Sequence, residues 1–402
     1  MSKEALWTKE FLLITFCNLF LFIAFYYLVV TLPIYALQEL NGSEAEAGLL
    51  ITSFLIAAII IRPLAGKWTI TFGNRLVLFI GLFLFLVCSS LYFLPETVLG
   101  MMLVRLLHGI GFGIATTAAG GIAANVIPPS RKGEGMGYYA LAFNLAVVLG
   151  PFLGLTALHK GNKVLLFGIV ILCSLIALVI GLLLSNTKGS ASLSTSNDKE
   201  RRKFDIVEKS AVRIAVVASF FAILYSSILS FVPVYAEDIG LLQVSSYFFV
   251  VYAAVMLLSR PLTGRWLDRY GENAIVYPSI FLFAIGMFLL SSSNSVVIFL
   301  LAAALIGLGW GTLFPTFQTI AVQKVTPERS GLAISTFLSI FDLGIGIGTF
   351  LVGIVMTQMS LQSLYFYSSF IVLFGIGLYN FLHGHHRGAV KGAVYERRTH
   401  SG

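Results

Sequence analysis

The clearest shortage in this 402-residue chain is charge, because Asp, Glu, Lys and Arg together make up only 11% of it. A soluble protein of this length needs a charged, hydrated surface, so the composition excludes an ordinary water-soluble fold. Cysteine is scarce as well, and Cys17, Cys88 and Cys173 all fall within apolar stretches. They behave there as small hydrophobic residues, and no disulfide framework is implied.

The residue patterns that enzymes need are missing too. The chain has no closely spaced catalytic carboxylates, no Cys–His cluster and no nucleophile elbow, so we expect neither an enzyme nor a cofactor. The glycine runs that begin at Gly109 and Gly307 lie inside apolar stretches with no strand before them, which argues against a dinucleotide site. His383, His385 and His386 have no carboxylate partner in the sequence, and we expect a solvated tail rather than a metal site.

Long apolar runs take the place of the missing charge. Hydrophobic residues make up 58% of the chain, and the mean hydropathy is +0.92. A helix needs roughly 20 apolar residues to cross a bilayer. Twelve runs qualify, at approximately residues 11–36, 48–66, 75–94, 98–126, 135–157, 164–185, 211–236, 244–264, 274–292, 296–322, 332–357 and 364–383. Backbone groups in lipid must be satisfied within each segment, so the sequence predicts an all-α integral membrane protein with twelve transmembrane helices.

The net charge of +8 follows a topological pattern. Lys and Arg gather at alternate connections between the runs, such as those with Lys67 and Arg75 or with Arg131. The intervening connections are acidic, with Lys160 and Lys163 as exceptions. Basic connections favour the cytoplasmic side, so we expect both termini in the cytoplasm and a lipid bilayer, not nucleic acid, around the chain.

The chain also repeats itself at an offset of 198 residues. Five pairs are related by this step: residues 62–68 with 260–266, 109–113 with 307–311, Arg131 with Arg329, Phe143 and Asn144 with Phe341 and Asp342, and Gly150 with Gly348. A tandem duplication of a membrane bundle is the architecture of alternating-access carriers, which hold a substrate between the two halves.

The expected domain organisation follows from the repeat. Residues 1–185 and 211–383 should each form a six-helix bundle, and the two bundles should be pseudo-symmetric. Residues 186–210 are rich in Ser, Thr, Asn and mixed charge, which predicts a cytoplasmic linker. Residues 384–402 are polar and basic, and we expect a cytoplasmic tail.

The turns that follow the first matched segments resemble the hallmark loop of the major facilitator superfamily. That loop consists of a glycine, a short spacer, an acidic residue, a basic residue and a second glycine. The second copy matches it at Gly264, Asp268, Arg269 and Gly271. The first copy keeps Gly66 and Gly73 but has Ile70 and Thr71 at the acidic and basic positions. The resemblance covers nearly the whole chain and implies that these glycines, Asp268 and Arg269 take part in gating.

Two further gating features are implied by the resemblance. Asp268 is expected to latch the cytoplasmic side by facing the start of the fifth helix, beside Arg131, where a carboxylate is favoured. Gly150 and Pro151 resemble the antiporter motif, a ladder of small residues that ends in Gly-Pro and marks exporters in the family. Proline removes a backbone donor and bends the helix, while the small face allows close packing. The second copy has Thr349 at the position of Pro151.

Arg105 and His108 are two ionisable groups inside the run 98–126. A buried guanidinium is costly and needs a partner or water, and we expect Arg105 to be the only basic residue so deep in an apolar helix. The resemblance links an arginine ahead of a glycine-rich run to proton transfer. His108 shares a helix face with Arg105 and titrates near neutrality when unperturbed, so it is a second candidate for proton coupling. A core imidazole bonded to a carbonyl is the alternative.

Asp342 is the only carboxylate in the middle of an apolar run, and glycines follow it. Burial penalises the charged form of a carboxyl group, so its protonation can switch with exposure to either side. Asn144 occupies the equivalent position in the first copy and cannot titrate. We therefore predict Asp342 as the main proton carrier, with a structural aspartate as the alternative.

Candidates for substrate contact come from the helices that face the central cavity in this family. They are Asn18, Phe22, Tyr26, Tyr138, Asn144, Tyr225, Ser226, Tyr252, Trp310, Phe314, Gln318 and Phe341. Aromatic side chains with few charges suit amphipathic or cationic organic solutes through stacking and cation–π contact. Aromatic residues are also common on lipid-facing surfaces, which is the alternative for each.

Together these features predict a proton-coupled transporter of a bacterial plasma membrane, acting as a monomer. It would export small amphipathic or cationic drug-like compounds, as in the drug:proton antiporter branch that the chain resembles. Other transport functions stay open: a Na⁺ or K⁺:proton antiporter with Asp342 as ligand, an exporter of a specific metabolite or metallophore, or an uptake symporter for sugars or organic acids. A receptor or scaffold that does not transport is the remaining alternative.

Overall fold

The computed structural model describes residues 5–159, 163–184, 206–241, 244–323, 325–356 and 358–383. Most of the expected linker at 186–210 lies outside the described residues. So do Lys160 and the whole expected tail at 384–402, including His385 and His386.

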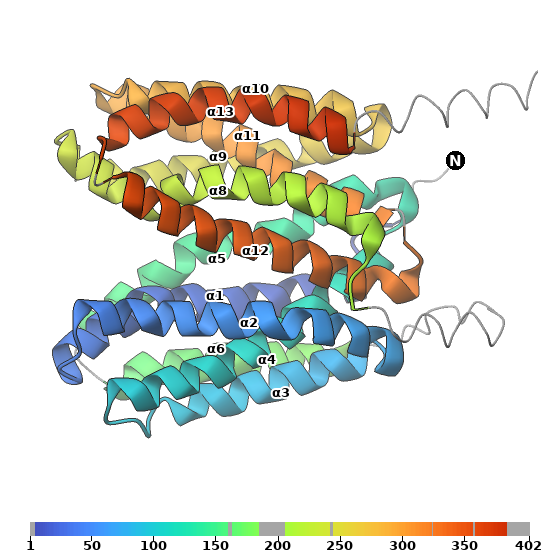
Figure 1. The fold of residues 1–402 in the computed structure, drawn as a ribbon. Helices are drawn as coiled ribbons and strands as arrows, with labels where there is room; N and C mark the ends of the chain where they lie inside the picture. The colour runs from blue at the N-terminus through green and yellow to red at the C-terminus, as the bar shows by residue number, and fades with distance from the viewer. Residues whose placement is uncertain are drawn as a thin grey trace, which may run out of the picture.

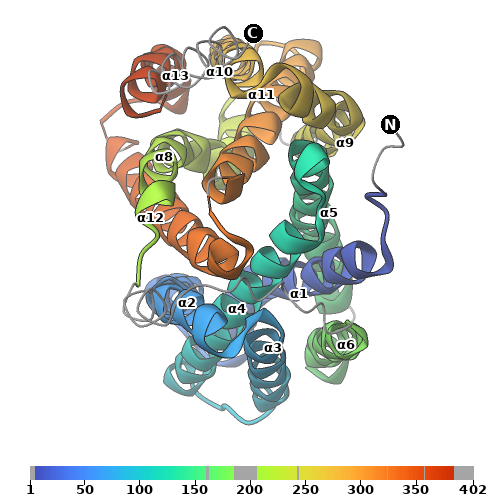
Figure 2. The ribbon, with the colours of Figure 1, turned by 90° about the vertical axis from the view of Figure 1, so that its right-hand side faces the viewer.

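Twelve long helices in the described part of the chain form two bundles of six (Figures 1 and 2). The first bundle contains α1 (Lys9–Glu39), α2 (Glu44–Phe72), α3 (Asn74–Leu91), α4 (Val98–Val126), α5 (Lys132–His159) and α6 (Lys163–Leu183). The second contains α8 (Lys209–Asp238), α9 (Ser245–Tyr270), α10 (Glu272–Ser291), α11 (Val296–Gln323), α12 (Ser330–Val355) and α13 (Leu361–Leu382). Each helix is long and apolar enough to cross a membrane, which confirms the predicted all-α membrane fold.

The sequence repeat is reproduced in backbone detail. Short 3₁₀ turns, η1 (Pro129–Arg131) and η3 (Pro327–Arg329), precede α5 and α12 at equivalent positions. Gly73 and Gly271, which end α2 and α9, have φ of 86° and 85°. Glycine is favoured in this region because it carries no Cβ. Both copies therefore use the same tight turn into the next helix.

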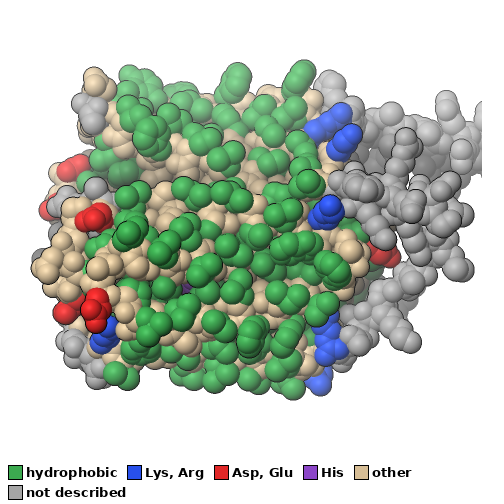
Figure 3. Space-filling view, turned by 60° about the horizontal axis from the view of Figure 1, so that its bottom comes forward, with side chains coloured by type: hydrophobic (Ala, Val, Ile, Leu, Met, Phe, Trp, Pro, Cys, Tyr) green, Lys and Arg blue, Asp and Glu red, His purple; other side chains and the backbone are tan. Residues whose placement is uncertain are grey.

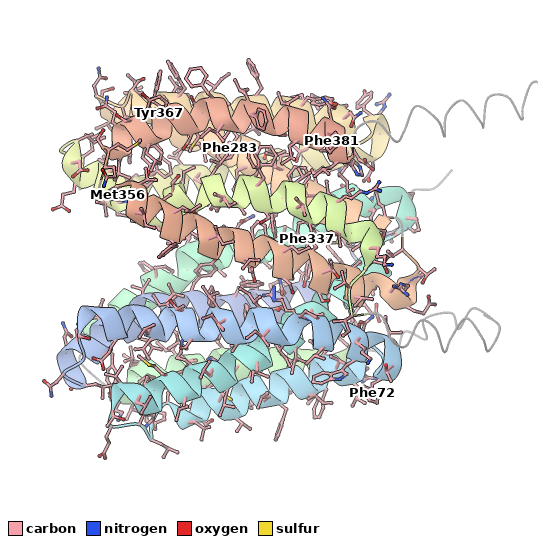
Figure 4. The ribbon with its side chains drawn as sticks, in the orientation of Figure 1. Phe72, Phe283, Phe337, Met356, Tyr367 and Phe381 are labelled. Atoms are coloured by element: carbon pink, nitrogen blue, oxygen red, sulfur yellow. The ribbon has the colours of Figure 1, made fainter. Side chains whose placement is uncertain are left out.

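Apolar side chains cover most of the face between the two ends of the bundles that Figure 3 shows, and many large apolar side chains are exposed. Tyr367 and Phe381 project from α13 into the surroundings (Figure 4) and are 56% and 85% exposed. Phe337, by contrast, is fully buried on α12, where that helix approaches the first bundle. An apolar belt of this extent fits contact with lipid.

Charged side chains mark the two ends of the bundles (Figure 3). We call one end the basic end, which carries Lys67, Arg75, Arg131, Arg265 and Arg329. The opposite, acidic end carries Glu39, Glu46, Glu96, Glu237 and Asp238. The first helix begins and the last helix ends at the basic end. This separation of charge matches the predicted pattern, and the placement of the basic end in the cytoplasm stays a prediction.

The two bundles meet along a surface that we call the seam, formed by α2 and α4 against α12 and by α5 against α9 and α11 (Figure 2). They approach most closely at the basic end. A Cβ on Gly66 of α2 would lie 3.1 Å from the Cα of Leu332 on α12, and one on Gly264 of α9 would lie 2.6 Å from the Cα of Glu134 on α5. The ribbons of the two bundles diverge toward the acidic end (Figure 1).

Candidate functional site

An ion pair joins the two bundles near the middle of the seam. Nη1 of Arg62, on α2, lies 2.9 Å from Oδ2 of Asp342, on α12. The Arg62 side chain is only 4% exposed, whereas that of Asp342 is 21% exposed, so water can reach the carboxylate. Taking two charges out of water is costly, and each group depends on the other for compensation.

Sequence reasoning missed Arg62 as a site residue. Arg62 and Arg260 are 3% and 2% exposed within α2 and α9, so the expectation that Arg105 is the only basic residue deep in an apolar helix was wrong. Both arginines stand close to the hallmark loops, within a few residues of the ends of the predicted spans 48–66 and 244–264. A long apolar run precedes each of them, and this was the signal of burial.

Arg105 lies inside the first bundle rather than beside Asp342. Its Nε donates to the carbonyl oxygen of Leu50 at 3.0 Å, and its guanidinium stands 4.3 Å from the centre of the Phe54 ring. These contacts join α4 to α2 and partly compensate the buried charge. A part for Arg105 in proton coupling stays a prediction.

His108 is also buried within the first bundle. Its Nδ1 lies 2.9 Å from the Tyr92 hydroxyl and its Nε2 lies 3.2 Å from the Ser89 hydroxyl, while its ring stacks on Phe85 at 4.0 Å. Both ring nitrogens thus have partners on or next to α3. The structure does not bring His108 together with Asp342, and its coupling role likewise stays a prediction.

Aromatic rings from both bundles form a continuous chain across the seam. Successive centroids are 4.5 to 6.3 Å apart along the series Tyr26, Phe143, Phe314, Phe341, Trp310, Tyr225 and Tyr252. The contact between Phe143 of α5 and Phe314 of α11, at 5.9 Å, crosses from one bundle to the other. Phe22 of α1 joins the chain through Phe143 at 5.1 Å. We call this series the aromatic chain.

Seven of the predicted substrate-contact residues, Phe22 included, belong to the aromatic chain, but Phe143 was not among the predictions. The repeat carried the signal, because Phe143 is the counterpart of Phe341. Other predictions lie elsewhere. Tyr138 packs on Trp7 at 4.7 Å, and Ser226 donates to the Ile223 carbonyl within α8 at 2.7 Å. The structure does not bring these two residues to the aromatic chain.

A small hollow of about 30 Å³ lies on the seam beside the aromatic chain. Its lining includes Asn18, Phe22 and Phe143 from the first bundle and Phe314, Gln318 and Leu338 from the second. Among the described residues, Oδ1 of Asn18 has no hydrogen-bond partner. The hollow has room for about one water molecule.

The contact expected for Asp268 is present at the basic end. Its Oδ1 and Oδ2 accept hydrogen bonds from the amides of Gly133 at 2.7 Å and Glu134 at 3.0 Å. Glu134 in turn pairs with Arg131 at 2.8 Å and with Arg265 of α9 at 3.1 Å. A negative charge is favoured at the start of α5 by the helix dipole. The role of this contact in gating stays a prediction.

The other predicted gating residues divide between the seam and the bundle interiors. Gly66 and Gly264 lie at close approaches across the seam, as described above. Gly150 packs within the first bundle, where a Cβ would lie 2.8 Å from the amide nitrogen of Tyr27 on α1. Pro151 follows within α5, and Arg269 stands over the Tyr270 ring at 5.2 Å. Their gating roles are not tested by these contacts.

His383 departs from the expectation of a solvated tail. Its Nε2 lies 2.7 Å from Oε2 of Glu272, at the start of α10. The expectation was wrong for this residue because Glu272 is 111 positions away and only the packing of α10 against α13 brings it near. No group of three metal-ligating side chains occurs among the residues that the structure describes.

Two bundles of six membrane helices, related by a tandem repeat and meeting at a seam with buried charge, define a secondary transporter fold. The model of the Major Facilitator Superfamily matches residues 14–349 and 242–393, and the chain belongs to that superfamily. Its members are transporters and not enzymes.

Individual relatives are distant. The chain is 25% identical over 353 residues to the uncharacterized MFS-type transporter MJ1560 of Methanocaldococcus jannaschii, covering 86% of this chain and 91% of that protein. It is 24% identical over 324 residues to Multidrug resistance protein 1 of Bacillus subtilis, covering 78% and 82%. The human organic anion transporter MFSD10 (TETRAN) has a similar fold, with a TM-score of 0.76 at 17% identity over 92% of this chain and 98% of that chain.

Proposed function

We propose that this protein exports small amphipathic organic compounds, cationic ones included, in exchange for protons by alternating access. The observation that supports this most directly is the ion pair of Arg62 with Asp342, which ties one bundle to the other at the middle of the seam. A carboxylate at that place controls both the charge of the seam and the attraction between the bundles.

Protonation of Asp342 would remove one charge of the pair. The bundles would then lose that attraction, and the Arg62 guanidinium would be left to find water or another partner. A proton shifts a conformational equilibrium only by its differential affinity for the two states. The state in which Asp342 is paired disfavours the proton, and the state in which the pair is open favours it.

The aromatic chain supplies the surface on which an organic compound would lie. Each stacking or cation–π contact of this kind contributes about 0.5–2 kcal/mol. The hollow of about 30 Å³ is too small for such a compound, since ligand pockets are about 300–1,000 Å³. Binding in this hollow would therefore require the bundles to separate along the seam, as in alternating access.

Export rather than uptake is supported by the antiporter-like ladder at Gly150 and Pro151 and by the similarity to Multidrug resistance protein 1. The charge pattern supports a cytoplasmic location for the basic end, and the proposed membrane around the apolar belt is the plasma membrane of a bacterial cell. The close approach at the basic end then corresponds to a conformation that is closed toward the cytoplasm.

The test uses the purified protein in liposomes loaded with the pH indicator pyranine. Ethidium is added on one side of the liposome membrane, with and without a protonophore as uncoupler. A pH gradient is imposed across the liposome membrane. We expect proton movement that depends on ethidium, and ethidium movement against its gradient that stops with the uncoupler. Proton movement driven by Na⁺ or K⁺ without any organic compound would replace this proposal by monovalent cation antiport. Ethidium movement indifferent to the uncoupler would refute proton coupling.

A further inference from the structure

Arg260, on α9, is a buried cation that lacks a counter-charge in the described part of the chain. It is 2% exposed, and its Nε and Nη2 have no hydrogen-bond partner among the described residues. The titratable side chain with an electrostatic effect on Arg260 is Tyr252, and its phenol carries no charge near neutral pH. A guanidinium cannot shed its proton in a protein, so this charge is left for water or an anion to stabilise.

The position of Arg260 is on the seam. Its Cδ lies 3.6 Å from the place of a Cβ on Gly137, so the side chain reaches from α9 to α5 of the other bundle. Asn144 follows Gly137 by seven residues, about two turns along the same face of α5. Tyr252, on the same helix as Arg260, is the last ring of the aromatic chain, and its centroid lies 6.3 Å from that of Tyr225.

The repeat shows which partner is missing. A step of 198 residues carries Arg62 onto Arg260 and Asn144 onto Asp342. In one copy of this arrangement, Arg62 meets the carboxylate of Asp342 at 2.9 Å. In the other copy, the position of the carboxylate is occupied by the neutral amide of Asn144. The fold therefore contains two related arginine sites on the seam, and the chain neutralises one of them.

We propose that Arg260, with Asn144, is a subsite for the carboxylate of the transported compound. The guanidinium would bind the carboxylate through two parallel hydrogen bonds, and the apolar body of the compound would lie on Tyr252, Tyr225 and Trp310. This inference rests on the proposed transport function and adds aromatic acids and zwitterions to the compounds proposed there. A neutral analogue would leave the buried guanidinium unpaired and bind more weakly.

The test compares 1-naphthaleneacetic acid with 1-naphthaleneacetamide, which share an aromatic body and differ in the charged group. Binding to the purified full-length protein is measured by calorimetric titration at pH 7.5. We expect the acid to bind at least tenfold more tightly than the amide. In Arg260→Gln the ratio of the two Kd values should fall toward one, and Arg260→Lys should recover part of it. Arg213→Gln, an equal loss of charge at an exposed position, is the matched control and should keep the ratio.

A second variant keeps the test valid if Arg260→Gln does not fold. By the 198-residue repeat, Asn144→Asp would place a carboxylate at the position that corresponds to Asp342, and it should reduce the acid's advantage at least tenfold. Equal binding of acid and amide to the wild-type protein, or an unchanged ratio in a folded Arg260→Gln or in Asn144→Asp, overturns the inference. The titration uses no proton gradient. The ratio of the two Kd values can therefore be as expected even if the liposomes show no proton coupling. That result would refute the proposed exchange mechanism but not this subsite.

Discussion

Asp268 and Gly133 are joined across the seam, with Oδ1 of Asp268 accepting a 2.7 Å hydrogen bond from the amide of Gly133. The second carboxylate oxygen accepts from Glu134, so one side chain of α9 caps the start of α5 in the other bundle. A cap of this kind exists only while the two bundles are in contact at the basic end. Its strength therefore contributes directly to the balance between conformations closed and open at that end.

Replacing Asp268 by Asn should open the basic end. The substitution keeps the side-chain shape but removes the charge, and hydrogen bonds to charged groups contribute about 1.5–3 kcal/mol. We expect the closed conformation to lose about 1–2 kcal/mol relative to the open one. Spin labels at Thr71→Cys and Glu328→Cys, in a background without the native cysteines, report the distance between the bundles. The matched control is Asp238→Asn at the acidic end, and equal distance distributions for both variants would contradict the latch.

A methyl group at Gly264 should also disturb closure. The Cβ of Gly264→Ala would stand 2.6 Å from the Cα of Glu134, so α9 would have to move away from α5. Overpacking of this kind costs about 1–3 kcal/mol, and we expect the population closed at the basic end to fall by roughly tenfold. The same pair of spin labels measures the change. Gly346→Ala, also within a helix but with no atom within 4 Å of the added Cβ, should leave the distances as they are.

Asp342→Asn should abolish proton-driven export while preserving the fold. Asn retains a hydrogen-bond acceptor for Arg62 but cannot bind and release a proton. Export of ethidium driven by a pH gradient in proteoliposomes is the measurement, and gel filtration of the purified variant checks folding. Asp238→Asn, an exposed carboxylate at the acidic end, serves as the control. Export by Asp342→Asn at the wild-type rate would remove Asp342 from the proton pathway.

Arg62 and Asp342 should show strong energetic coupling. Breaking a buried ion pair by removing one partner costs about 3–5 kcal/mol, and we expect about 1–3 kcal/mol here because water reaches Asp342. The double variant Arg62→Gln with Asp342→Asn should cost less than the sum of the two single variants. The measurement is a double-mutant cycle on the free energy of unfolding in mixed micelles. Lys67→Gln and Asp238→Asn, at two charges far apart at opposite ends, should have additive effects on the free energy of unfolding. Additive effects for Arg62→Gln and Asp342→Asn as well would show that these two residues are not coupled.

Much of the fold could be predicted because its signals are local. The length of an apolar run decides whether a helix can span the membrane, and α1 to α13 follow those runs within a few residues. The contact of Asp268 with the start of α5 was also expected, because a known family motif carried it. The partner of Asp342 was not, since no motif pairs it with Arg62, a residue 280 positions earlier in the chain.

The separation of Arg105 and His108 from Asp342 has the same origin. Helical periodicity shows that Arg105 and His108 share a face of α4, but it does not show which helix covers that face. Packing places that face against α2 and α3, inside one bundle. The repeat would have pointed to Phe143 and Arg260, since each is the counterpart of a residue that lies on the seam.

The sequence by itself determined twelve membrane spans, a tandem repeat and two ends of opposite charge, because each of these depends on composition over short stretches. The tertiary structure decided which buried charges meet, since the partner of a side chain is set by the helix packed against it. For that reason Arg62 meets the carboxylate of Asp342, whereas Nε and Nη2 of Arg260 have no hydrogen-bond partner among the described residues. The chemistry of the seam therefore follows from how the two bundles are placed against each other.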